Sequence, residues 1–232
     1  MSLNIKLLAF IFCSTLGVLA QKGKNEEPVK ILDKGSIYIS SYTPIAYGDN
    51  FANKGLELST GFRLGLNFYF DERFIVGLDY RNIYAENVDK QRLGLYDNTE
   101  IHSLNFKGGY RYPINEKFVA SATVFVGLAW YQSRSNQNSQ SFRDGAVTFG
   151  LTTNLTYTII GGLGIFIAPE FRFDSLKTKA PARIKDFFDN VNYITFSAGI
   201  RFTFKNKIYA WELERDRLER EEDAQKVSRS RT

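Results

Sequence analysis

The fold is decided by residues 56–70, which read LELSTGFRLGLNFYF. Even-numbered positions carry mainly apolar side chains such as Leu64 and Phe70, whereas odd-numbered positions carry Arg63, Asn67, glycines and other polar residues. Successive side chains of a β-strand point to opposite faces of the sheet. The alternation therefore predicts one continuous strand with an apolar side and a polar side, and it places Glu57 on the polar side.

The same period of two recurs along the rest of the chain. Further strands are predicted to begin near residues 74, 103, 118, 147, 165 and 194, and residues 36–47 form a weaker one that contains Pro44. Short connections follow residues 70, 112 and 158, and they alternate with long polar ones at residues 48–55, 87–98, 133–145 and 176–192. Eight antiparallel strands with tight turns at one end and long loops at the other predict an all-β, up-and-down barrel.

Two kinds of barrel fit this alternation, and they differ in which face of the strands points outward. A soluble, lipocalin-like barrel would enclose the apolar side chains, whereas a transmembrane barrel would expose them to lipid. The interior of eight strands is only just wide enough to be filled by side chains, and the polar faces consist mainly of small residues with few charges. Aromatic residues near the strand ends, such as Phe74 and Tyr112 at one end and Trp130 and Tyr193 at the other, are typical of membrane girdles. The sequence thus predicts a transmembrane β-barrel.

The first 20 residues have the features of a secretory signal peptide. A basic start with Lys6 precedes an apolar run, and Ala20 stands at the cleavage position before Gln21. The run is shorter than the roughly 20 residues that a membrane-spanning helix needs. Cleavage would remove Cys13, the only cysteine, and with it every disulfide, Cys-ligated zinc site or cysteine nucleophile. Residues 21–35 are charged and show no periodicity, so they are predicted to form a flexible periplasmic leader.

Residues 36–204 resemble the small eight-stranded outer-membrane barrels of Gram-negative bacteria, of the OmpX and OmpA-transmembrane kind. The likeness rests on the signal peptide, the strand alternation, the loop asymmetry and the aromatic ending Ile200-Arg201-Phe202-Thr203-Phe204. It implies that the protein lies in the outer membrane, surrounded by outer-membrane lipid, with both chain termini in the periplasm.

Charged residues on the polar strand faces are predicted to form a network in the lumen. Its members are Glu57, Arg63, Asp79, Arg81, Lys107, Arg111, Glu170, Arg172, Asp174 and Arg201. Charges in a narrow interior are costly unless they are paired and hydrogen-bonded. The network is therefore expected to plug the lumen, and the alternative is an ion-selective pore.

Composition excludes several classes of function. The formal net charge of +5, from 30 Lys+Arg and 25 Asp+Glu, is spread along the chain and does not indicate nucleic-acid binding. The single histidine, His102, shares the apolar face with Leu104, whereas Ser103 points to the opposite face. These neighbours cannot form a nucleophile–base pair, so no catalytic residue, metal or cofactor is predicted and the protein is predicted not to be an enzyme.

Residues 205–232 are predicted to form a charged periplasmic helix. They are rich in helix formers and include the oppositely charged i,i+3 pair Glu214 and Arg217. Ile208, Trp211 and Leu218 form a narrow apolar stripe. The stripe is either part of a solvated helix or a docking surface for a periplasmic or outer-membrane protein partner.

These observations predict an integral outer-membrane barrel with a structural, recognition or accessory-subunit role in a larger envelope complex. A narrow pore for small solutes and a lipid-modifying enzyme are the two alternative functions.

Overall fold

The computed structural model describes residues 30–94, 96–135, 141–178, 185–208, 214–215 and 217–218. The chain divides into a barrel unit, Leu32–Asn206, and a second unit made of the two chain ends. The strands are β1 (Lys30–Tyr47), β2 (Leu56–Leu58), β3 (Gly61–Phe70), β4 (Phe74–Asn87), β5 (Asn98–Pro113), β6 (Phe118–Arg134), β7 (Ser141–Ile160), β8 (Leu163–Leu176) and β9 (Asn190–Ile208). Three short helices, α2 (Phe51–Gly55), α3 (Lys90–Leu93) and α4 (Lys185–Asp189), lie in the long connections.

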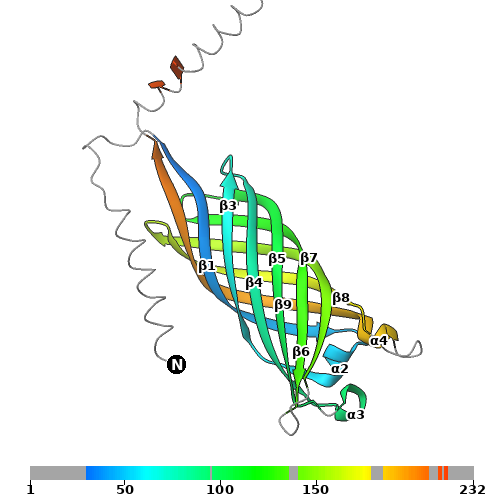
Figure 1. The fold of residues 1–232 in the computed structure, drawn as a ribbon. Coiled ribbons are helices and arrows are strands. Elements are labelled where there is room, and N and C mark those ends of the chain that lie inside the picture. The colour runs from blue at the N-terminus through cyan, green and yellow to red at the C-terminus, as the bar shows by residue number, and fades with distance from the viewer. Residues whose placement is uncertain are drawn as a thin grey trace, which may run out of the picture. The chain divides into compact units, whose positions relative to one another are not determined.

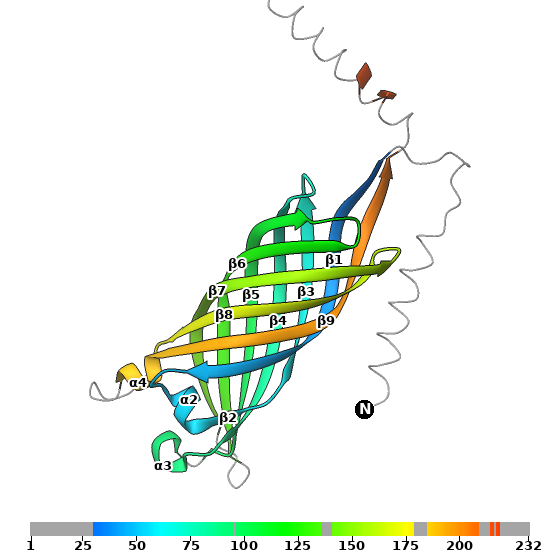
Figure 2. The ribbon, with the colours of Figure 1, turned by 180° about the vertical axis from the view of Figure 1, so that it is seen from behind.

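The strands form one closed antiparallel barrel. Each of β3 to β8 pairs with the next strand along the chain, and β1 lies between β3 and β9, so no edge of the barrel is left open. Because β2 and β3 come from one predicted strand, the barrel has the eight predicted strands. The all-β, eight-stranded, up-and-down architecture is confirmed. Figures 1 and 2 show the three helices at the same end of the barrel, called here the loop end, and the tight turns at the other, the turn end.

Two strand boundaries differ from the prediction. β1 begins at Lys30, so residues 30–35 are strand rather than flexible leader. Gly35 lies opposite Phe68 of β3, and the Asp33 carboxylate pairs with Arg111 on β5. These backbone and charge contacts extend the strand where apolar alternation is absent. β9 likewise continues beyond residue 204 and ends at Ile208. Ile208 is therefore a strand residue and does not belong to the predicted helix.

The chain-end unit is described at only a few positions. Glu214, Arg215, Arg217 and Leu218 are helical, and Arg217 Nη2 lies 2.8 Å from Glu214 Oε1. Trp211 and the signal peptide lie outside the described residues. The docking surface on the helix and cleavage after residue 20 therefore stay predictions.

Residues 56–70 contain a β-bulge, and residues 56–58 therefore face the opposite way from the prediction. Leu58 lies opposite Ala85 and Phe62 lies opposite Asn82, so four steps on one strand match three steps on the other. The extra residue falls between β2 and β3, and it shifts the side-chain phase by one. As a result Leu56 is buried and Glu57 is exposed. The prediction that Glu57 faces the lumen is wrong for this reason.

The outward face of the strands is an apolar belt. Leu64 and Val126 are 42% and 53% exposed, as expected for side chains that contact lipid. Other exposed members are Phe68, Leu78, Leu104, Phe106, Val124, Leu128, Phe149, Leu151, Ile165, Ile167, Phe196 and Ile200. Tyr193 was predicted to belong to the loop-end girdle, but it is fully buried and points inward.

The interior changes character along the barrel. An apolar cluster fills the loop end and includes Tyr42, Phe51, Ile83, Ile101, Val191 and Tyr193. Buried polar and charged side chains occupy the middle and the turn end, where Arg63, Asp79 and Arg81 lie. No helix within the described ranges has the length and apolarity of a membrane span.

Candidate functional site

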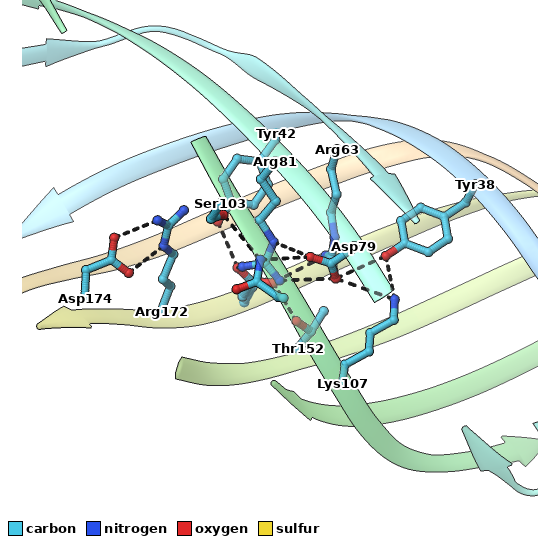
Figure 3. Close-up of polar contacts among 12 residues, drawn as sticks. Tyr38, Tyr42, Arg63, Asp79, Arg81, Ser103, Lys107, Thr152, Arg172 and Asp174 are labelled. Carbon is cyan, nitrogen blue, oxygen red and sulfur yellow. Dashed lines mark hydrogen bonds and ion pairs between the residues drawn. The ribbon is translucent and has the colours of Figure 1, made fainter. Parts of the chain in front are cut away.

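Asp79 is the central carboxylate of the lumen, and it lies on β4 with its side chain pointing inward (Figure 3). Arg63 Nη2 donates to Asp79 Oδ2 at 2.7 Å, and Arg81 Nε donates to Oδ1 at 2.9 Å. Asn105 Nδ2 donates to Oδ1 at 3.2 Å, and Lys107 Nζ lies 3.6 Å from Oδ2. Asp79 therefore connects β3, β4 and β5 through the interior.

Glu170 on β8 completes the bridge across the lumen. Arg81 Nη1 donates to Glu170 Oε1 at 2.7 Å, and Arg63 Nη1 lies 3.3 Å from Oε2. The Tyr42 hydroxyl donates to Oε1 at 2.9 Å, and Thr152 Oγ1 donates to Oε2 at 2.5 Å. The two arginines thus bind a carboxylate on each side of the barrel, and this cross-link spans the lumen.

A second ion pair lies nearer the loop end. Arg172 forms a two-pronged contact with Asp174, with Nε–Oδ1 and Nη2–Oδ2 distances of 2.8 and 2.6 Å. The Tyr131 hydroxyl donates to Asp174 Oδ2 at 2.5 Å and lies 2.9 Å from the Tyr193 hydroxyl. All four side chains are buried, and the two tyrosines connect the ion pair to the apolar cluster.

The remaining cations lie toward the turn end. Lys107 Nζ donates to the Tyr38 hydroxyl at 2.5 Å, and Arg201 Nη1 donates to Thr156 Oγ1 at 2.7 Å. Arg111 pairs with Asp33 near the rim. Lys107 and Arg201 therefore have neutral hydroxyls as their nearest hydrogen-bond partners.

The structure brings together nine of the ten charged residues predicted for the lumen, and Glu57 is the exception. Sequence reasoning missed the four phenols that complete the network: Tyr38, Tyr42, Tyr131 and Tyr193. Each of these tyrosines occupies an inward-facing position in the alternation of its strand, together with other buried residues. That position is the signal by which the sequence could have revealed them. Buried tyrosines usually find a partner for the hydroxyl, and here the partners are the charged groups.

His102 takes part in a polar cluster on the outside of the barrel. Its Nδ1 lies 2.7 Å from the Tyr80 hydroxyl, and its Nε2 lies 3.3 Å from Glu100 Oε2. Ser103 is fully buried and accepts a hydrogen bond from Asn105 inside the barrel. His102 and Ser103 therefore lie on opposite sides of the barrel wall, as predicted. Within the described ranges, no group of three or more metal-binding side chains is present.

A cavity of about 170 Å³ opens at the loop end. Apolar side chains from α2, α3, α4 and the ends of β2 and β8 line it: Phe51, Leu56, Leu93, Leu176 and Phe188. Asn87 and Asp144 add an amide and a carboxylate to the lining. The Asn87 Oδ1 atom is buried and accepts no hydrogen bond in the described structure.

Fold and lumen together define a closed transmembrane β-barrel of the outer-membrane type, with buried ion pairs crossing its interior. No protein-family model matches the chain, and a search of curated proteins finds no match. Among solved structures, the chain is similar to Neisserial surface protein A, with 12% identity, a TM-score of 0.52, and coverage of 73% of this chain and 97% of that one. The attachment invasion locus protein Ail of Yersinia pestis has 16% identity and a TM-score of 0.47, with 75% of this chain and 99% of that one covered. At 12% identity, the likeness to Neisserial surface protein A is one of fold.

Proposed function

We propose that this protein is an outer-membrane recognition protein, in which a sealed barrel anchors a binding cavity that faces the cell exterior. The cavity at the loop end is the observation that carries the proposal, because its lining combines apolar walls with the amide of Asn87 and the carboxylate of Asp144. The outer-membrane location is supported by the lipid-facing belt and by the fold. Long loops on the outside and both termini in the periplasm are part of the proposal, since this is the usual orientation of such barrels.

The cavity fits a single aromatic ring that carries a hydrogen-bond donor. An engineered apolar cavity of about 150 Å³ in another protein binds benzene, so 170 Å³ accommodates one substituted ring. Phe51 and Phe188 stack with a centroid distance of 5.8 Å at one wall, which gives a bound ring flat aromatic surface to pack against. The Asn87 Oδ1 atom and the Asp144 carboxylate are acceptors, so a phenol or an aryl amine matches them better than an unsubstituted ring.

Binding of phenol can be tested by NMR on the whole protein in lipid nanodiscs. Methyl signals of Leu93 and Leu176 in the cavity should shift on addition of phenol, whereas those of Ile75 at the turn end should not. Ser133→Phe should weaken phenol binding at least about tenfold, because the larger side chain fills the cavity that Ser133 lines. Gln132→Phe is the matched control, since residue 132 is adjacent and faces outward.

Toluene provides the chemical control. Asn87→Leu should weaken phenol binding and leave toluene binding nearly unchanged, because only phenol can donate to the amide oxygen. Equal shifts at lipid-facing methyls such as Leu104 and Leu128, with no saturable change at Leu93, would mean that phenol only partitions into the bilayer and would overturn the proposal.

The pore alternative has less support, because Arg63 and Arg81 bridge carboxylates on both sides of the lumen. The purified protein in planar bilayers should give no conductance steps above the baseline of protein-free membranes. A 16-stranded porin reconstituted in parallel is the positive control. Stable single-channel steps at neutral pH would favour the pore and contradict a sealed anchor.

The enzyme alternative also has less support, because Ser103 and His102 lie on opposite sides of the barrel wall. A docking role for Trp211 and Leu218 in the chain-end unit stays a separate prediction.

A further inference from the structure

The buried interior of the barrel carries more positive than negative charge. The cations exposed by less than a tenth are Arg63, Arg81, Lys107, Arg111, Arg172 and Arg201, and the equally buried carboxylates are Asp79, Glu170 and Asp174. Asp33 neutralises Arg111 at the rim. Six cations against four carboxylates leave a surplus of two positive charges among the described residues.

The surplus lies toward the turn end of the lumen. Arg63 and Arg81 share Asp79 and Glu170, and Arg172 has Asp174 to itself. Lys107 reaches Asp79 only at 3.6 Å, and Arg201 donates to a hydroxyl. The Nε atom of Arg201 is buried and has no hydrogen-bond partner in the described structure. Arg201 therefore has no carboxylate partner among the described residues, and Lys107 shares Asp79 with two arginines that lie closer to it.

A small cavity lies between these cations. Its volume is about 20 Å³, and its lining includes Arg63, Lys107 and Arg201 together with Ser121, Thr123 and Asn154. A cavity of roughly 10–15 Å³ holds one water molecule, so this one has room for a single particle of about that size. Three cations thus surround a space that hydroxyl and amide groups also reach.

We propose that this cavity binds one halide ion, chloride under ordinary conditions, between Lys107 and Arg201. A water molecule would fit the space but would leave the surplus of positive charge in place, which is costly in a buried interior. A monatomic anion satisfies both the charge and the size. The barrel would then hold its anion as an internal part of the plug and would not transport it.

The first test is direct and needs no variant. Crystals of the whole protein soaked in sodium bromide should show an anomalous peak in the cavity, within hydrogen-bond distance of Lys107 Nζ and the Arg201 guanidinium. Peaks confined to exposed positions, with none in the cavity, would overturn the proposal. That result would mean that the surplus is relieved in another way, such as loss of the proton from Lys107.

The second test compares thermal unfolding in sodium chloride and in sodium gluconate at the same ionic strength. Gluconate is too bulky for the cavity, so the melting temperature should be higher in chloride. The rise should be roughly 3–6 °C when the chloride concentration is tenfold above the dissociation constant. Equal melting temperatures in the two salts would contradict chloride binding.

Variants test whether the chloride-dependent rise in melting temperature arises from binding in this cavity. Arg201→Gln should abolish the chloride-dependent rise, whereas Lys117→Gln, which removes an exposed charge at the β5–β6 turn, should retain it. Thr123→Val keeps every charge, and it should reduce chloride affinity several-fold by removing a hydroxyl from the lining. This variant provides the comparison if Arg201→Gln does not assemble. An unchanged chloride response in both cavity variants would place the ion elsewhere and overturn the assignment.

Discussion

Asp79→Asn is expected to lower the free energy of unfolding by about 3–5 kcal/mol, because the change leaves buried cations without their carboxylate. The asparagine keeps the shape of the side chain but cannot neutralise Arg63 and Arg81, which contact Asp79 at 2.7 and 2.9 Å. Urea unfolding in lipid vesicles, followed by tryptophan fluorescence, measures the loss. A change in gel mobility on boiling provides an independent measure of the folded fraction.

Two further variants separate the loss of a buried charge partner from a general effect of the substitution. Asp33→Asn breaks the rim pair with Arg111. The Asp33 side chain is partly exposed to solvent, so this change should cost only about 1 kcal/mol. Arg63→Met combined with Asp79→Leu replaces a buried pair by apolar groups and should recover part of the loss. If Asp79→Asn and Asp33→Asn destabilise the barrel equally, the central network does not have the role assigned to it.

Val126→Arg is expected to cost about 2–4 kcal/mol, because a charge near the middle of the lipid-facing belt must lose water or distort the bilayer. Val126 lies halfway along β6 and is 53% exposed on the outward face. The same urea unfolding experiment measures the effect, and Leu64→Arg on β3 should behave alike.

Gln132→Arg, on the same outward face but near the loop end of β6, is the control for Val126→Arg. Charges near the membrane interface cost only about 0–1 kcal/mol. Tolerance of arginine at both positions would indicate that this face of the barrel does not contact lipid.

The barrel could be predicted from the sequence because alternation is a local signal repeated in each strand. Its exact phase could not be predicted across residues 58–61, because a single extra residue leaves each half of the stretch alternating normally. Gly61 was the available clue. A Cβ atom at this position would come within 1.7 Å of the Asn82 carbonyl oxygen, so the close approach of β4 requires glycine there.

The sequence predicted most of the charged residues that lie in the lumen, but it did not predict which of them pair with one another. Arg63 and Glu170 are more than 100 residues apart in the sequence, and only the closed circumference brings them within 3.3 Å. The loop-end cavity had no periodic signal at all. Phe51, Leu93 and Phe188 come from three separate connections, and side chains in irregular segments carry no period from which their facing can be read.

Pairing of β1 with β9 closes the barrel, and it also constrains the order in which the strands can assemble. Ser41 Oγ lies 3.1 Å from the carbonyl oxygen of Ala198 and 3.3 Å from its amide nitrogen, although the two residues are 157 positions apart. Contacts at such separation require almost the whole chain to be present, and closing long loops slows folding. Until β9 has joined the sheet, β1 and the strand added last are unpaired edges, and other chains can pair with them. The barrel is therefore most vulnerable to aggregation just before its last strand arrives, and protection of those edges is what its assembly must supply.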